Sequence, residues 1–124
     1  MTPTTVAAQR TAIETALTAA TIKNTSDPTL FTAQQSMVVI FGGGSDNLAG
    51  VSFKTWAYRL ACCVPLGPKT GVTALTTLTL AVLAVAEALA GCAVVGVGPE
   101  SLVTTEGGVR YLAADVNVVM YVTI

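Results

Sequence analysis

The chain has 124 residues, of which 52% are hydrophobic and only 10% are charged, with a formal net charge of -1 and no histidine. This length suits a single domain with one hydrophobic core, and we expect one domain over residues 1–124. A net charge so close to zero argues against a basic surface that binds nucleic acid. Because so few charges are present to cover a lone monomer, we expect part of the apolar surface to meet a partner protein.

The first predicted element is an amphipathic helix over residues 6–20, which Thr4 or Thr5 can cap. The apolar side chains of this segment share one helical stripe and the polar ones lie off it: Val6, Ile13, Leu17 and Ala20 against Gln9, Arg10 and Glu14. The turn-forming residues 24–28 follow. We therefore expect this helix to lie on the domain with one side in water.

Residues 34–41 predict the first strand, buried on both faces because its β-prone apolar residues are consecutive. The glycine-rich residues 41–50, FGGGSDNLAG, then predict a flexible hairpin connection. A phosphate-binding loop is the alternative. It is disfavoured because no Gly-Lys-Ser/Thr follows and the dinucleotide-binding spacing is absent.

Residues 51–64 predict a long strand, since their side chains alternate between two faces. One face holds Trp56, Tyr58, Leu60, Cys62 and Val64. The two aromatic residues could form a stacking platform for single-stranded nucleic acid, but without neighbouring cations we interpret them as core. Pro65 and the Gly-Pro that follows it end the strand.

Residues 70–90 predict a second helix, capped by Thr70 and carrying one charge, Glu87. Its large apolar side chains share one stripe: Leu75, Leu78, Val82, Val85 and Leu89. With so little charge, this helix is expected to be covered on most sides by the rest of the protein. A membrane span over residues 80–98 is the rival interpretation, and Gly91, the valine-rich continuation and the central Glu87 argue against it.

After this helix, residues 92–97 predict a short buried strand and residues 98–108 a mostly exposed connection. The last segment, residues 109–124, alternates most clearly. Its even positions are apolar and face the core: Leu112, Ala114, Val116, Val118, Met120, Val122 and Ile124. The odd positions, which include Tyr111 and Tyr121, face water or a partner.

The sequence offers no residues for catalysis, for a cofactor or for a metal ion. Nucleophilic catalysis by Ser or Cys usually needs a base such as histidine, and none is present. The three cysteines, Cys62, Cys63 and Cys92, lie in apolar runs without metal-ligand spacing, as small buried side chains do. Because these catalytic groups are missing, we expect that the protein is not an enzyme. The N-terminal residues also lack the pattern of a secretory signal, so we expect the protein to fold in a reducing cytoplasm.

In chain order, these elements predict an α+β fold with a mostly antiparallel sheet of about four to five strands and two helices packed on one face. The other face of the sheet is then left uncovered. It is mixed enough to be an interface between copies of the chain, being lined by Phe53, Ala57, Ala61, Tyr111, Val119 and Tyr121 among polar residues.

With its opening helix, its FKTWAYRLACCVPLG strand before a helix, and its closing VRYLAADVNVVMYVTI strand, the chain resembles the tail terminator proteins of long-tailed phages. The resemblance covers nearly the whole chain and implies a structural virion subunit, assembled in the host cytoplasm, that forms a hexameric ring at the head-proximal end of the tail. Such a ring ends polymerisation of the major tail tube protein and offers the joining surface for the head-completion proteins. It implies no catalytic residues, no cofactor and no membrane, and DNA only passes through the lumen.

We expect the rims of such a ring to come from two loops, residues 42–50 and 99–108. With the uncovered sheet face, they give these candidate interface residues: Gly42, Gly43, Gly44, Asp46, Asn47, Glu100, Ser101, Glu106, Tyr111 and Tyr121. Two alternatives stay open. A head-completion or stopper protein would contact the portal rather than the tube, and a non-viral oligomeric module would hold a small apolar ligand beneath the helices.

Overall fold

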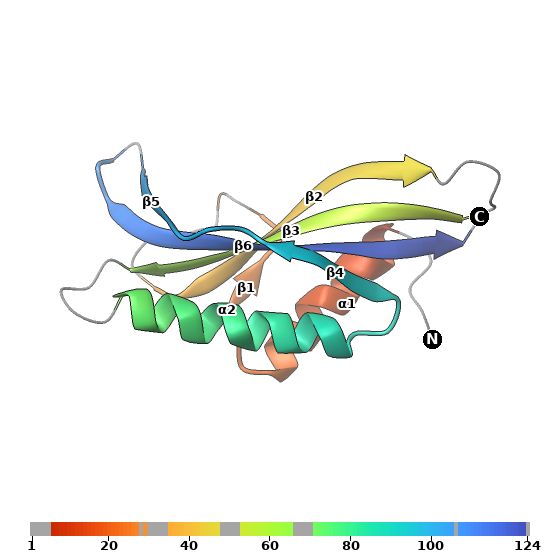
Figure 1. Cartoon of the computed structure of the whole chain (residues 1–124), viewed down its shortest axis with the longest axis horizontal. Coiled ribbons are helices and arrows are strands. Elements are labelled where there is room, and N and C mark those ends of the chain that lie inside the picture. Colours follow the sequence, from red (N-terminus) through yellow and green to blue (C-terminus); the bar gives the residue numbers. More distant parts are fainter. Residues whose placement is uncertain are drawn as a thin grey trace.

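The structure is a computed structural model that describes residues 6–27, 29, 35–47, 53–65, 71–105 and 107–123. It is an α+β fold in which two helices lie against one mixed, mostly antiparallel sheet of six strands (Figure 1). The elements, in chain order, are α1 (Val6–Ala19), β1 (Asn24–Thr25), β2 (Met37–Asn47), β3 (Phe53–Pro65), α2 (Gly71–Ala88), β4 (Cys92–Val97), β5 (Ser101–Thr104) and β6 (Arg110–Thr123).

The strands are ordered β1-β2-β3-β6-β4, and β5 also pairs with β6. Only the short β1 is parallel to its neighbour, β2. Because β3 pairs along the whole of β6 from Tyr111 to Thr123, both β4 and β5 lie along the opposite edge of β6. Between these two strands, Gly98 N donates to Asp115 O at 2.7 Å, which continues the pairing across the break.

The two alternating segments, β3 and β6, are neighbours within the sheet, and each has one face in the core, as the sequence predicts. In β3 and β6, the residues of one alternating set enter the core beneath the helices: Tyr58, Leu60, Cys62, Val64, Ala114, Val116, Val118 and Met120. From α1 the core receives Ile13 and Leu17, and from α2 it receives Leu75, Val82 and Ala86. Val122 belongs to β6, but its side chain is outside the described part of the chain, and Ile124 lies wholly outside it.

Two expectations about loops were wrong in part. Residues 42–47 belong to β2 and are paired with β3 through a bulge between Gly42 and Ser45, because ladder hydrogen bonds hold a glycine-rich strand that has little preference of its own. Residues 101–104 form β5 rather than part of a connection, since β6 extends past β4 and offers them a free edge. The residues 48–50 of the expected hairpin connection and the expected capping residue Thr70 lie outside the described residues.

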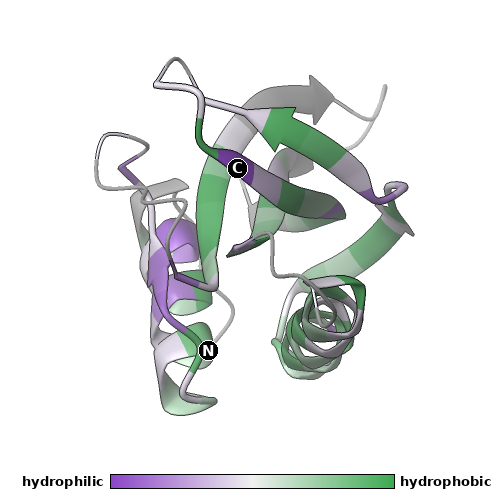
Figure 2. Cartoon of the chain, turned by 90° about the vertical axis from the view of Figure 1, so that its left-hand side faces the viewer, coloured by the Kyte–Doolittle hydropathy of each residue, from purple (hydrophilic) through white to green (hydrophobic). Residues whose placement is uncertain are grey.

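The expectation that α2 is covered on most sides was also wrong. It packs on β3, β4 and β6, but its buried residues are only Gly71, Leu75, Val82 and Ala86. Val72 and Leu80 are 57% and 59% exposed. Seen nearly end-on in Figure 2, α2 is apolar or neutral over most of its surface, and Glu87 is its one charged residue. The helix therefore has a covered side rich in Leu and Val and a bare side on which Val72 and Leu80 lie among Thr and Ala residues.

By length and composition α2 could cross a membrane, and 22% of this helix is buried in the fold. The window that the sequence suggested, residues 80–98, is not one helix. The helix ends at Ala88, Gly91 takes the left-handed conformation with a φ of 76°, and β4 begins at Cys92. Contrary to expectation, β4 is only half buried, because it is an edge strand on which Val95 and Val97 are exposed.

Candidate functional site

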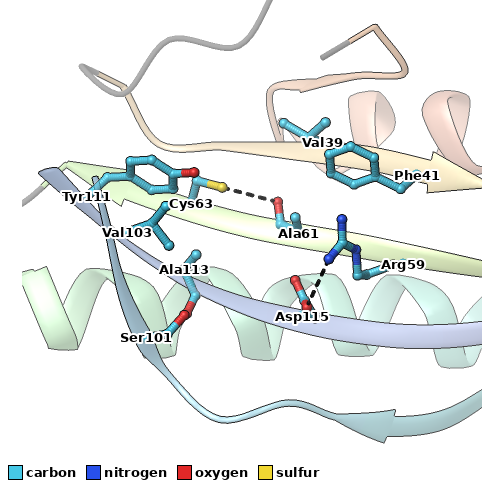
Figure 3. A pocket seen from close by; sticks show the side chains of 10 residues that line it. All are labelled: Val39, Phe41, Arg59, Ala61, Cys63, Ser101, Val103, Tyr111, Ala113 and Asp115. Carbon is cyan, nitrogen blue, oxygen red and sulfur yellow. Dashed lines mark hydrogen bonds and ion pairs between the residues drawn. The ribbon is translucent and has the colours of Figure 1, made fainter. Parts of the chain in front are cut away.

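The face of the sheet that lies away from the helices carries a hollow of about 430 Å³ (Figure 3). It lies over β2, β3, β5 and β6, with α2 behind the strands in this view. Its lining comprises Val39, Phe41, Arg59, Ala61, Cys63, Ser101, Val103, Tyr111, Ala113 and Asp115. Of the residues predicted for this face, Ala61 and Tyr111 are therefore in the hollow.

One end of the hollow is apolar. Val39, Ala61 and Cys63 form a small buried cluster, and Tyr111 packs against it. Burial raises the pKa of the Tyr111 hydroxyl, and the neighbouring Cys63 raises it further. A neutral phenol beside small apolar side chains makes this end suited to an apolar side chain of a partner.

The other end of the hollow is charged. Arg59 Nη1 lies 3.8 Å from Asp115 Oδ2, and Arg59 Cζ lies 4.4 Å from the centroid of the Phe41 ring. The Arg59 side chain is exposed and that of Asp115 is partly exposed, so the ion pair contributes about 1 kcal/mol or less. We interpret these charges as a polar border that could orient a group bound at the apolar end. They add little to the stability of the fold.

The thiols are not activated for chemistry. Cys62, Cys63 and Cys92 are all free, the first two buried and the third half-buried. Burial raises the pKa of Cys62 to about 12, and it raises those of Cys63 and Cys92 to about 11. Because the thiolate is the nucleophile and the metal ligand, thiols with such pKa values are poor at both at neutral pH.

The predicted interface residues are spread over both edges and the hollow. Gly42 is exposed on β2, whereas Glu100 is exposed between β4 and β5, on the opposite side of the sheet. Of the four whose surroundings are described, Ser101 and Tyr111 come together in the hollow, where Ser101 Oγ donates to Ala113 O at 3.4 Å. The other six are Gly43, Gly44, Asp46, Asn47 and Tyr121, which belong to strands but whose surroundings lie outside the described part, and Glu106, which lies wholly outside it.

Sequence reasoning missed the polar half of the hollow. Arg59 and Asp115 both fall on the outward positions of their strands, which was a usable signal. Their pairing depends on the register of β3 with β6, in which Arg59 is opposite Asn117 and Ala61 is opposite Asp115. That diagonal relationship cannot be read from either segment alone.

Apolar side chains are also exposed elsewhere, on α2, along the β4 and β5 edge and in the turn after it: Val72, Leu80, Val95, Val97, Leu102 and Val109. By contrast, the described residues nearly fill the space between the helices and the sheet. The gap lined by Ile13, Leu60, Val82 and Val118 has a volume of about 10 Å³, room for one water molecule at most.

Within the described residues, no group of three or more His, Cys, Asp and Glu side chains converges as a metal site would require. The hollow presents an apolar floor, a phenol and an ion pair. The chain matches no model of a known protein family and no curated protein.

Proposed function

We propose that this chain is a structural subunit of a phage tail terminator ring, with six copies at the head-proximal end of the tail tube. In this role it ends polymerisation of the tube protein and presents a joining surface to the head-completion protein. It performs no catalysis and binds no cofactor. DNA passes through the lumen without sequence-specific contact, and the assembled protein is part of the virion.

The observation that carries this proposal is the amount of apolar surface left bare on a small domain. Apolar side chains are exposed on the outer side of α2 and along the β4 and β5 edge, and the open sheet face is hollowed over an apolar floor. Soluble monomers rarely leave contiguous apolar patches uncovered, whereas subunits of permanent assemblies do so routinely. A ring of identical copies supplies the missing cover.

The two segments proposed as rims also suit a ring. The β2 to β3 connection follows the pair Asn47 and Lys54 at one end of the strands, and the β5 to β6 turn follows the pair Thr104 and Arg110 at the other. If the strands run roughly along the ring axis, these connections lie on opposite rims. One rim can then contact the tube and the other the head.

The nearly filled space beneath the helices favours this role over the non-viral module, because it has no room for a small apolar ligand. The stopper role differs only in its partner. To decide between them, purified protein is offered separately to tail tubes that are still elongating and to portal rings. A terminator binds the tube end and halts elongation, and a stopper binds the portal assembly.

The first test of the proposal is the mass of the purified protein in solution, followed by electron microscopy. We expect rings with an open centre, either free or on tube ends. Tubes that elongate at the same rate with and without the protein, together with no binding to portal rings, would overturn the proposal.

A further inference from the structure

The side of the molecule formed by α1 and the free edge of β2, called here the α1 flank, carries Arg10. In α1, Gln9, Ile13 and Leu17 face the sheet, whereas Arg10 and Glu14 share the neighbouring stripe. That stripe points away from α2, since Glu14 accepts a hydrogen bond from Ser26, just after β1. Among the described residues, the edge of β2 has no strand beside it here, because β1 pairs only with its first residues.

Arg10 is half-buried, and its guanidinium reaches the helix-facing side of β2 at Gly42. Its Nη2 is 2.6 Å from the point where a Cβ atom on Gly42 would stand, so this approach depends on the glycine. Arg10 Nε is buried without a hydrogen-bond partner among the described residues, and so is Nε1 of the nearby Trp56. The one ion pair in the described part of the chain joins Arg59 and Asp115, which leaves the charge of Arg10 uncompensated there.

The opposite side, called here the α2 flank, carries Glu87. Thr76, Leu80 and Glu87 are spaced four and seven residues apart, so they share one stripe of α2. Thr76 Oγ1 lies 3.5 Å from Glu100 Oε1, which shows that this stripe points toward the edge formed by β4 and β5. Glu87 is exposed and is the only charged residue of α2.

Arg10 and Glu87 lie near the same cross-strand row of the sheet. Gly42, which Arg10 contacts, is opposite Tyr58, which in turn is opposite Val118 of β6 and, beyond it, Val94 of β4. Ala86, the residue before Glu87, lines the same small gap as Val118. An unpaired cation and an exposed carboxylate thus lie near one level on opposite flanks.

We infer that the α1 flank of one copy joins the α2 flank of the next, with the guanidinium of Arg10 against the carboxylate of Glu87. This inference rests on the ring of the proposed function and names the contact that closes it. The two flanks are different surfaces, so the contact is heterologous and generates a ring when the rotation closes. The exposed Leu80 and Val95 are covered in the same joint.

The strand directions agree with such a joint. Each of the pairs β2 with β3, β3 with β6 and β6 with β4 is antiparallel, so β2 and β4 run in opposite directions. A second copy rotated about an axis along the strands keeps these directions. The free edge of its β2 therefore meets β4 in the antiparallel sense, and the sheet can continue from copy to copy.

The test uses the charge reversals Arg10→Glu and Glu87→Arg, with association followed by analytical ultracentrifugation. Each single variant places like charges at every joint and is expected to weaken association by about tenfold, whereas the double variant restores it. An equal mixture of the two single variants is also expected to recover, in rings where the variants alternate. In those rings every joint has one cation facing one carboxylate.

Arg110→Glu is the matched control, because Arg110 is exposed at the start of β6 and belongs to neither stripe. It is expected to associate like the wild type. Thermal unfolding of each variant separates assembly from folding, and Glu87→Arg keeps the test valid if Arg10→Glu does not fold, since Glu87 is exposed.

Single reversals that associate like the wild type, or a mixture that does not recover, would overturn the inference while leaving the ring itself intact. Wild-type protein that stays monomeric at every concentration also overturns it. In that case the tube-elongation assay still decides the proposed function separately.

Discussion

Tyr58 of β3 donates a hydrogen bond from its hydroxyl to Gln9 Oε1 of α1 at 3.0 Å, and both side chains are buried. The bond joins residues 49 positions apart and ties the first helix to the centre of the sheet. Burial raises the pKa of the Tyr58 hydroxyl, although the positive charge of Arg10 opposes this, so the phenol stays neutral and donates.

Replacing Tyr58 with phenylalanine removes this bond while keeping the ring. We expect the free energy of unfolding to fall by about 1–2 kcal/mol, because a buried amide loses a partner without gaining water. Urea unfolding followed by circular dichroism measures the change. An unchanged midpoint would show that the bond contributes nothing to the attachment of α1.

Leu75 and Leu80 lie on opposite sides of α2, at 0% and 59% exposure. Leu75→Ala is expected to lower the free energy of unfolding by about 2–5 kcal/mol, because it leaves a cavity between α2 and the sheet. Leu80→Ala serves as the matched control and is expected to change the stability of the monomer by about 0.5 kcal/mol or less. Equal losses in chemical unfolding of the two variants would contradict the described placement of the helix.

Gly91 immediately precedes β4, whereas Gly96 lies within this strand, and the two glycines differ in backbone conformation. Gly91 has a φ of 76°, a conformation that costs a residue with a side chain about 1 kcal/mol, so Gly91→Ala should lower the melting temperature. A Cβ atom on Gly96 would meet nothing within 4 Å, and Gly96→Ala is expected to leave stability nearly unchanged. Differential scanning calorimetry of the two variants compares them directly.

The buried thiols predict a loss of stability at alkaline pH. In the unfolded chain the thiols ionise near pH 9, whereas burial raises the pKa values in the folded protein to about 11–12. Above pH 9 the unfolded chain therefore binds fewer protons, and the free energy of unfolding falls as pH rises toward 12. Below pH 9 these groups contribute no pH dependence.

Urea midpoints measured across that alkaline range test this expectation. In Cys62→Ala the urea midpoint is expected to fall less with pH than in the wild type, since Cys62 has the most strongly raised pKa of the three thiols. A wild-type profile that stays level through this range would mean that the thiols are more accessible than described.

The hollow can be filled without touching the core. Ala113 lies in the floor of the hollow and is partly exposed, so Ala113→Arg should change the stability of the monomer little. The variant places a long, positively charged side chain where we expect the partner to bind. We expect reduced association and reduced capping of tail tubes, measured by ultracentrifugation and electron microscopy. Unaltered association and capping would remove the hollow from the interface.

Sequence patterns predicted the elements whose side chains repeat regularly. The alternation in β3 and β6 and the apolar stripe of α2 each reflect burial on one side, so they could be read directly. The same patterns could not distinguish cover by the chain itself from cover by another copy, which is why the bare side of α2 was misjudged. Local composition also misplaced residues 42–47, where pairing with β3 overrides the turn preference of glycine.

The hollow could be predicted only in outline. The outward-facing positions of the two long strands correctly predicted Ala61 and Tyr111. Val103 could not be predicted, because it belongs to β5, whose four residues show no regular alternation. The meeting of Arg59 with Phe41 depends on the register between β2 and β3. Register and strand order are properties of the whole chain, so a segment-by-segment interpretation cannot supply them.

Strand β6 is the hub of the sheet, since it pairs with β3 on one edge and with β4 and β5 on the other, yet it is translated after all of them. A nascent chain still on the ribosome therefore holds β3, β4, β5 and α2 without the strand that all four contact. Folding of this domain must wait for β6 to leave the exit tunnel, and a message truncated before that point yields a polypeptide destined for chaperones and proteases.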